Sequence, residues 1–249
     1  DLDLFSDAPP GSGLGSSSAL VVAMLAAVAA HAREPVTPYE LAGRAYTVER
    51  VDLRQAGGMQ DQYAAAFGGF NFIEFLGQDR VVVNPLRIDP NVENELHGSL
   101  LLCDTRMTRR SGGILKRQVE GYTSGRAESL RSLARIKELT VELKEALLTG
   151  NLARFGEGLS ENWEAKRRLA EGISTDRIEE LYEIGLKAGA VGGKVLGAGG
   201  GGHLLLFCPF RQRPAVARAM EVAGARIVRF HFEARGVQTW RARAEEEAP

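Results

Sequence analysis

The stretch PPGSGLGSSSA, residues Pro9 to Ala19, places three glycines and a run of three serines directly before a long apolar segment. Glycine loses more conformational entropy on folding than any other residue, so ordering such a loop is costly. That cost is offset when the loop makes a tight turn, packs closely against other backbone or binds an anion. The elements on either side of the loop bear on the choice among these three.

The loop lies between an expected strand and an expected helix. The alternating residues around Leu2 and Leu4 predict a strand, and the run from Ser16 to about Arg33 predicts a helix that is buried on nearly all sides. Backbone N–H groups and the positive end of the helix dipole make such a junction a natural anion site. The candidate phosphate-binding residues are Gly11, Ser12, Gly13, Leu14, Gly15, Ser16, Ser17 and Ser18.

Other interpretations of this loop stay open. A glycine–serine turn with Ser16 as the helix N-cap needs no ligand. The loop is not a Walker P-loop, because no Gly-Lys-Ser/Thr ends it, and its glycines are one residue too close for a dinucleotide motif. The segment Gly15–Ala19 resembles a nucleophile elbow, which leaves a serine hydrolase as an alternative. The preceding Pro-Pro-Gly-Ser-Gly, however, moves the strand too far away for the sharp turn of an elbow.

The composition is that of an ordinary globular protein: 249 residues, 44% hydrophobic and 25% charged, with a net charge of −1. This length supports one large domain or two smaller ones. The balanced charge argues against a nucleic-acid partner. The longest apolar run, residues 19–30, is too short to span a membrane. The sequence gives no oligomeric state, and a homo-oligomer is compatible with it.

Cys103 and Cys208 lie far apart in apolar, strand-like segments. Their spacing predicts two buried thiols and neither a disulfide nor a metal site. A cytoplasmic protein is expected, since the sequence shows no signal peptide. The chain starts at Asp1 in a segment that alternates like the middle of a sheet, so we expect that a preceding segment has been removed.

The remaining patterns predict an α+β protein. Thr37-Pro38-Tyr39-Glu40 has the pattern of a capped helix start, and Asp61 to Phe67 predicts a short helix stopped by two glycines. Further helices are expected at residues 111–122, 128–149, 152–170, 175–188 and 214–222, and strands at residues 70–75, 80–88, 96–105, 203–209 and 225–234. A domain boundary is expected near residues 90–98, which gives domains at 1–95 and 96–249.

Three further features are chemically suggestive. A second glycine-rich loop, GGKVLGAGGGG at residues 192–202, indicates either close backbone packing or a second side to a phosphate pocket. Asp61 stands at a helix start, where the dipole favours an ionised carboxylate, and it could act there simply as a cap. Glu49, taken by itself, would be an exposed helix glutamate.

In this order, these stretches resemble the GHMP small-molecule kinases. The family's P-x-x-x-G-L-G-S-S-A motif is matched up to Ser17, with Ser18 where the alanine usually stands, and KVLGAGGGG matches the motif near the C-terminus. The family's first motif would lie before residue 1. The resemblance implies the two-domain GHMP kinase fold, with an incomplete N-terminal domain and a C-terminal α/β sandwich.

Within that family the chain is most similar to the D-glycero-D-manno-heptose 7-phosphate 1-kinases of bacterial surface-polysaccharide synthesis, through GGMQDQYAAAFGGFNFIEF at residues 57–75. The resemblance implies transfer of the ATP γ-phosphoryl group to the anomeric hydroxyl of a small sugar phosphate. It implies that the first glycine loop cradles ATP, that Ser17 and Glu49 hold Mg²⁺, and that Asp61 is the general base.

The substrate side of the site is less specified. A basic cluster at residues 106–117 could be a solvated helix face, although a sugar phosphate favours arginine forks. The four histidines show no ligand spacing and are interpreted as structural or surface residues. A kinase for fucose, galactose or another small alcohol, and a non-catalytic binding protein of the same fold, stay open. The candidate substrate residues are Arg109, Lys166, Lys194, Gly199, Gly200 and Gly201.

Overall fold

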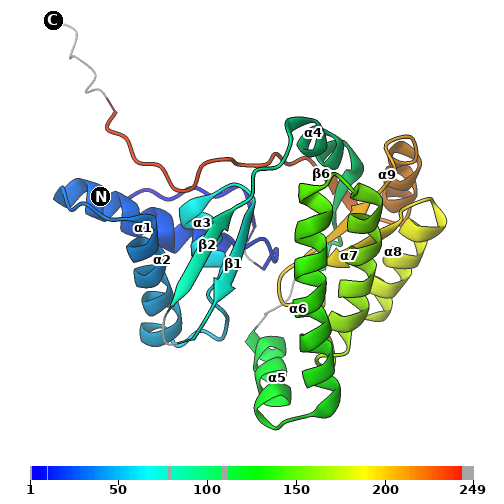
Figure 1. Ribbon diagram of the computed structural model, residues 1–249, viewed down its shortest axis with the longest axis horizontal. Helices are drawn as coiled ribbons and strands as arrows, with labels where there is room; N and C mark the ends of the chain where they lie inside the picture. Colours follow the sequence, from blue (N-terminus) through cyan, green and yellow to red (C-terminus); the bar gives the residue numbers. More distant parts are fainter. Residues whose placement is uncertain (1, 10, 78–79, 108–111, 243–249) are drawn as a thin grey trace, which may run out of the picture. The chain divides into compact units, whose positions relative to one another are not determined.

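The structure is a computed structural model, which describes residues 2–9, 11–77, 80–107 and 112–242 (Figure 1). The chain folds as two units. The first unit runs through Ser16 and again from Phe72 to Phe232, and the second runs from Ser17 to Asn71 and again from Glu233 onward. The chain therefore passes from the first unit to the second between Ser16 and Ser17.

An antiparallel sheet of four strands, in the order β4-β5-β3-β6, forms the centre of the first unit. Its central pair sets Leu102 opposite Leu205 and Asp104 opposite His203. The apolar run in β3 is buried on both faces, which explains why its residues do not alternate with polar ones. The strands are β3 (Leu100–Asp104), β4 (Gly192–Val195), β5 (His203–Phe207) and β6 (Arg226–Val228).

Helices pack on this sheet through a core in which Trp163, Leu181 and Met220 are fully buried beside Leu204 and Leu206. Figure 1 shows the long helices of this unit, coloured green to yellow. The helices are α4 (Pro90–Ser99), α5 (Gly112–Thr123), α6 (Ala127–Leu148), α7 (Leu152–Arg167), α8 (Asp176–Lys187) and α9 (Arg213–Val222). A separate two-stranded sheet is formed by β1 (Asn71–Phe75) and β2 (Val81–Pro85).

Over residues 17–67 the regular elements of the second unit are helices. Thr37 and Glu40 form the predicted capping box at the start of α2, and α3 ends at two glycines with positive φ. The segment that follows Phe232 returns to this unit, where the Gly69 N–H donates to the carbonyl oxygen of Glu233. The elements are α1 (Ser16–Ala32), α2 (Pro38–Tyr46), the π-helix η1 (Thr47–Asp52) and α3 (Gln60–Phe67).

These elements confirm the predicted α+β class and most of the predicted helices. Cys103 and Cys208 are both free thiols and fully buried, as expected. Burial raises the pKa of Cys103 to about 12 and that of Cys208 to about 11, so neither is a reactive thiolate. Among the described residues, none of the helices combines the length and the apolar character that crossing a lipid bilayer requires.

Two predictions about the start of the chain are wrong. The segment around Leu2 and Leu4 is not a strand, since neither residue pairs with a strand among the described residues. The α1 helix is not buried on nearly all sides, because Ala27 and Val28 are exposed while Val22 and Ala26 are buried. A uniformly apolar helix carries no signal for which face is covered, so the pattern overestimated its burial.

Three further boundaries differ from the prediction. Residues 96–99 belong to α4, a helix that Asp89 caps and Pro90 starts, so the strand predicted from residue 96 begins at Leu100. Residues 192–195, assigned to a loop, form β4. The last predicted strand shortens to Arg226–Val228. In each case pairing within the sheet, which local patterns do not contain, decides where the strand lies.

Candidate active site

The first glycine loop has the conformation that its glycines predict. Gly11, Gly13 and Gly15 all have positive φ, between 73° and 78°, which is the left-handed region that only glycine occupies freely. The α1 helix begins at Ser16, immediately after the last of them. The N–H groups of a first helical turn have no partner within the helix, so this end of α1 presents backbone donors and the positive end of the dipole.

The second glycine loop packs directly on the first. A Cβ atom added at Gly202 would lie 2.4 Å from the carbonyl oxygen of Ser12, and one added at Gly197 would lie 2.7 Å from the Cα atom of Gly13. A Cβ atom at Gly13 would in turn lie 3.0 Å from the carbonyl oxygen of Leu196. The two loops, residues 11–16 and 192–202, therefore form one structure made of backbone, here called the glycine-loop pair.

Backbone hydrogen bonds hold the second loop in place. The Gly202 carbonyl oxygen accepts from the Thr105 N–H at 2.9 Å and from its hydroxyl at 2.8 Å. The Gly202 N–H donates to Met107, and the Gly200 N–H donates to Ile173 at 2.6 Å. A Cβ at Gly201 would lie 2.7 Å from the Met107 carbonyl oxygen. Close packing of the protein backbone therefore explains the glycine at position 201, and the N–H of Gly200 is already bonded to protein. Both are candidate substrate residues.

Two lysines lie beside this loop. The Lys166 ammonium donates to the carbonyl oxygens of Val195 and Gly197, at 3.0 and 2.5 Å, and the Lys194 ammonium donates to the Asn162 side chain at 2.5 Å. Each side chain keeps some exposed surface, but the ammonium groups are surrounded by protein. Desolvation lowers the pKa of Lys194 to about 8. Desolvation, with repulsion from Lys194, lowers that of Lys166 to about 7.

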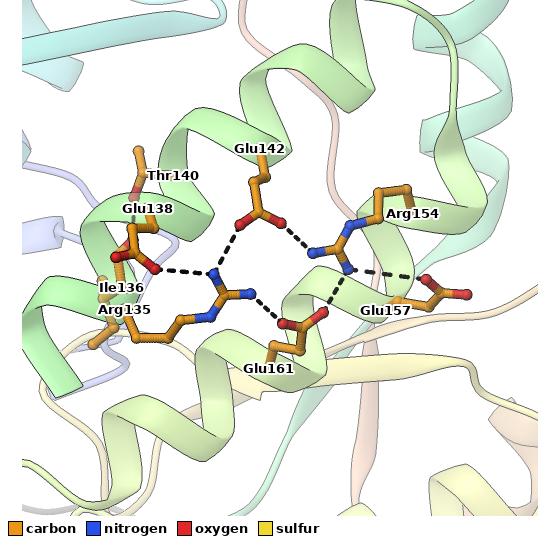
Figure 2. Close-up of polar contacts among 8 residues, drawn as sticks. All are labelled: Arg135, Ile136, Glu138, Thr140, Glu142, Arg154, Glu157 and Glu161. Carbon is orange, nitrogen blue, oxygen red and sulfur yellow. Dashed lines mark hydrogen bonds and ion pairs between the residues drawn. The ribbon is translucent and has the colours of Figure 1, made fainter. Parts of the chain in front are cut away.

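Helix α7, which carries Asn162 and Lys166, is fixed to α6 by a ring of charges that Figure 2 shows. The two guanidinium groups alternate with two carboxylates, and each guanidinium bonds both acids. Three of the bonds measure 2.5 to 2.8 Å, and the fourth joins Arg154 to Glu142. The ring holds the helix that in turn touches the second loop. Its members are Arg135 and Glu142 from α6, and Arg154 and Glu161 from α7.

The remaining substrate candidate, Arg109, lies outside the described residues. Of the basic cluster around it, Arg117 donates to the carbonyl oxygen of Glu171 at 3.2 Å, and Lys116 is an exposed side chain 3.9 Å from Glu120. Both contacts are typical of a helix face, which was the alternative explanation for this cluster.

In the second unit, polar side chains gather around one buried carboxylate. Glu49 is 1% exposed and lies on η1, a helix type that is rare and often marks functional sites. Its carboxylate accepts from the Ser17 hydroxyl at 2.9 Å, the Ser18 hydroxyl at 2.6 Å and the Gln62 amide at 2.5 Å. The Arg50 guanidinium lies 3.9 Å from it. The prediction of an exposed glutamate is therefore wrong, because α1 and α3 place three polar side chains against it. We call Glu49 and its three donors, Ser17, Ser18 and Gln62, the Glu49 cluster.

The two predicted metal ligands are brought together in this cluster. The Ser17 Oγ and Glu49 Oε1 atoms lie 2.9 Å apart, about the spacing of neighbouring ligands around an octahedral Mg²⁺ with bonds of roughly 2.1 Å. The residues that the structure describes contain no group of three or more His, Cys, Asp or Glu that could hold a metal alone. The donor set therefore fits a Mg²⁺ ion whose other ligands are phosphate oxygens and water.

Asp61 does not cap the helix on which it lies. The N-cap of α3 is Met59, which places Asp61 at the second helical position with a half-buried side chain. The capping explanation for Asp61 is therefore wrong. The next residue, Gln62, is fully buried, with its amide nitrogen on Glu49 and its amide oxygen without a hydrogen-bond partner among the described residues. This short helix thus joins the predicted general base to the Glu49 cluster.

Two residues of the site were not predicted from the sequence. Gln62 is distinguished from a surface glutamine only by its burial, and the neighbouring sequence does not predict that burial. His203 was interpreted as structural or surface, yet it is 2% exposed and contacts the first glycine loop. A signal was present for His203, since it is the polar residue at the head of the apolar strand HLLLF, directly after the second loop.

Comparison with known proteins assigns both parts of the chain. Residues 1–69 match the model of the GHMP kinases N terminal domain, and residues 143–225 match that of the GHMP kinases C terminal domain. The chain is 37% identical to the D-glycero-alpha-D-manno-heptose 7-phosphate kinase of Campylobacter jejuni over 243 residues, which cover 96% of this chain and 70% of the relative.

Two solved structures are similar to the fold. One is a D-glycero-D-manno-heptose 1-phosphate kinase from Bacteroides thetaiotaomicron, with a TM-score of 0.77 and 33% identity over 96% of this chain. The other is a putative sugar kinase from Campylobacter jejuni, with a TM-score of 0.76 and 38% identity over 95% of this chain. The chain spans 67% of each of these structures. The fold inferred from the glycine motifs is confirmed.

Proposed function

The chain belongs to the GHMP kinase family, and from this premise we propose that the complete protein transfers the γ-phosphoryl group of ATP to the anomeric hydroxyl of D-glycero-D-manno-heptose 7-phosphate. The observation that carries the choice of sugar is the similarity, along 96% of the chain, to a heptose 7-phosphate kinase. The product would be a sugar bisphosphate for nucleotide-heptose and surface-polysaccharide synthesis, in the cytoplasm.

The first glycine loop binds the ATP phosphates in this proposal. Its support is the run of positive φ angles that ends at the N-terminus of α1, where backbone donors and the helix dipole favour an anion. The second loop supplies the support on which the first one rests. The proposed substrate residues are Gly199, Gly200, Gly201, Lys166, Lys194 and Arg109.

Ser17 and Glu49 hold Mg²⁺, with phosphate oxygens of ATP as further ligands. The bound metal would neutralise phosphate charge during the transfer. Within the Glu49 cluster, Ser18 and Gln62 fix the direction of the carboxylate by donating to it. The Ser17 hydroxyl donates to this carboxylate and not to a histidine, which favours a metal ligand over the serine-hydrolase nucleophile.

Asp61 accepts the proton of the sugar hydroxyl as that oxygen attacks the γ-phosphorus. The support is that its half-buried carboxylate lies in the first turn of α3 and does not cap that helix. The bond from phosphorus to the bridging oxygen of ADP breaks as the new bond to the sugar oxygen forms.

We further propose that the N-terminal domain covers residues 1–95 and the C-terminal domain residues 96–249. This division is compatible with the two matched segments, which end at residue 69 and begin at residue 143. A kinase for fucose, galactose or another small alcohol is the second candidate for the function, since fucokinases and galactokinases are also among the relatives that the chain matches.

The test is ADP formation by the complete protein with a panel of acceptors. Heptose 7-phosphate should support turnover far better than fucose, galactose or heptose without its phosphate. A preference for an unphosphorylated sugar would replace the proposed substrate but keep the kinase. Stoichiometric labelling of Ser17 by a fluorophosphonate, without ADP formation for any acceptor, would overturn the kinase itself.

A further inference from the structure

We propose that His203 is a positioning residue for nucleotide binding, which sets the direction of a backbone donor in the first glycine loop. The inference rests on the proposed ATP-binding role of that loop. His203 is the first residue of β5, is 2% exposed, and places its Nδ1 atom 2.8 Å from the carbonyl oxygen of Ser12. Both residues lie in the first unit.

The direction of this hydrogen bond follows from its partners. A carbonyl oxygen can only accept, so the His203 Nδ1 atom must carry the proton and donate it. The Ser12 carbonyl is itself buried by the second loop, because Gly202 packs against it so closely that a Cβ there would lie 2.4 Å away. A buried carbonyl without a donor is costly, so this contact fixes the peptide group that follows Ser12.

The geometry of the peptide bond transmits the contact to the ligand side. No peptide bond among the described residues is cis. In a trans peptide group the C=O and the following N–H point in opposite directions. Since the Ser12 C=O points at the buried His203 ring, the N–H of Gly13 must point away from it. Gly13 cannot compensate by rotating freely, because its backbone is pressed against Leu196 and Gly197.

His203 therefore acts on the phosphate through the backbone and not by touching it. It is fixed to the sheet on its own other side, where its carbonyl oxygen accepts from the Leu196 N–H at 2.9 Å and its strand pairs with β3. One strand residue thus ties the central sheet, the second loop and the first loop together. A preorganised donor of this kind binds more tightly than one that must be ordered on binding.

The test compares three variants of the complete protein by the dissociation constant of ATP, the KM values for ATP and sugar phosphate, and the melting temperature. His203→Leu removes the donor and fills similar space. His203→Asn keeps an N–H donor on the atom that corresponds to Nδ1. Tyr182→Phe removes a different hydrogen bond of this unit, from its hydroxyl to Ser160, and serves as a control for lost stability.

We expect His203→Leu to weaken ATP binding by about tenfold, as for the loss of one oriented hydrogen bond, with the KM for the sugar phosphate unchanged. His203→Asn should restore most of the ATP affinity. Tyr182→Phe should lower the melting temperature and leave the ATP affinity unchanged. If His203→Leu does not fold, His203→Gln, whose donor is one bond too far, should show the same loss relative to His203→Asn.

Equal ATP affinity in the wild type and His203→Leu would overturn the positioning role. So would losses of ATP affinity in His203→Leu and His203→Asn in proportion to their losses of melting temperature, accompanied by a comparable loss of affinity in Tyr182→Phe. A wild-type protein that binds no ATP would instead overturn the proposed function, which keeps the two failures distinct.

Discussion

The glycine-loop pair and the Glu49 cluster achieve polar recognition in opposite ways. The glycine-loop pair is built of backbone: at Gly197 and Gly202 there is no room for even one more carbon atom, and at Gly13 a Cβ would make a tight contact. The Glu49 cluster is built of side chains, in which a buried carboxylate is held by hydroxyl and amide donors. Added atoms should therefore damage the loop pair, whereas removed atoms should damage the cluster.

The difference teaches how each region can vary. A backbone site keeps its chemistry under any sequence that keeps the same φ angles, so it specifies phosphate but not a particular substrate. A side-chain site depends on each donor, because a buried carboxylate without partners is strongly disfavoured. The mutations below, within the two regions or beside them, are ordered from the largest expected effect to the smallest, and the last experiment compares the two regions themselves.

Asp61→Asn should lower kcat by roughly 10²–10⁴-fold, because an amide keeps the shape but cannot accept the proton. The melting temperature and ATP affinity should change little, since Asp61 lies inside α3 and does not cap it. Steady-state kinetics and thermal unfolding check both parts. A wild-type kcat, or a loss that unfolding fully explains, would remove Asp61 from the chemistry.

Gln62→Leu should destabilise the second unit by about 1–3 kcal/mol, because a buried carboxylate loses one donor. The matched control is Gln60→Leu, an exposed glutamine on the same helix, which should have almost no effect. Urea unfolding of the two variants measures the difference. Equal stabilities would show that the cluster does not depend on its individual donors.

Lys166→Met tests the buried ammonium beside the second loop. The pKa of Lys166 is lowered to about 7, against an ordinary value of 10.5, so between these values the unfolded chain binds more protons than the folded one. The free energy of unfolding of the wild type should therefore rise, relative to Lys166→Met, as the pH increases from 7 to 10.5.

Urea titrations across that pH range give this difference. The control is Lys187→Met, which removes an exposed ammonium and should give a difference that does not change with pH. A flat difference for Lys166→Met as well would mean that its ammonium is as well solvated as that of Lys187.

Glu161→Gln, in the ring of charges between α6 and α7 (Figure 2), should cost the least, about 0–1 kcal/mol, because the ring is partly exposed. The cost should shrink at high salt, which screens surface charges. Denaturation at low and high ionic strength measures both. A large and salt-independent loss would show that this ring behaves like the buried Glu49 cluster.

The sequence predicts the loop pair far better than the cluster, for a physical reason. A backbone site requires glycine, and glycine is visible in the sequence, so the loops, the start of α1 and the family could be inferred from the motifs. The polar surroundings of the buried Glu49 could not, because its partners Ser18 and Gln62 lie 31 and 13 positions away in the sequence. Only the resemblance to a family pointed to Glu49 as a ligand.

Contacts between distant segments explain the other differences. His203 is 191 positions away from the residue that it holds, and Gln62 is fully buried by its surroundings and not by its own pattern. The exposed side of α1 was not predicted for a related reason, since a helix that is apolar on all sides does not indicate which face packs against other residues. Caps such as Thr37 were predicted because their partners lie within the same turn.

ATP affinity measured with and without Mg²⁺, for Gly13→Val and Glu49→Gln, tests the contrast between the two regions most directly. Gly13→Val should weaken ATP binding by at least about tenfold in both conditions, because its side chain meets the Leu196 carbonyl oxygen and distorts the phosphate loop. Glu49→Gln should weaken it only when Mg²⁺ is present. Wild-type affinity in Gly13→Val, or an equal loss in Glu49→Gln with and without the metal, would contradict the account.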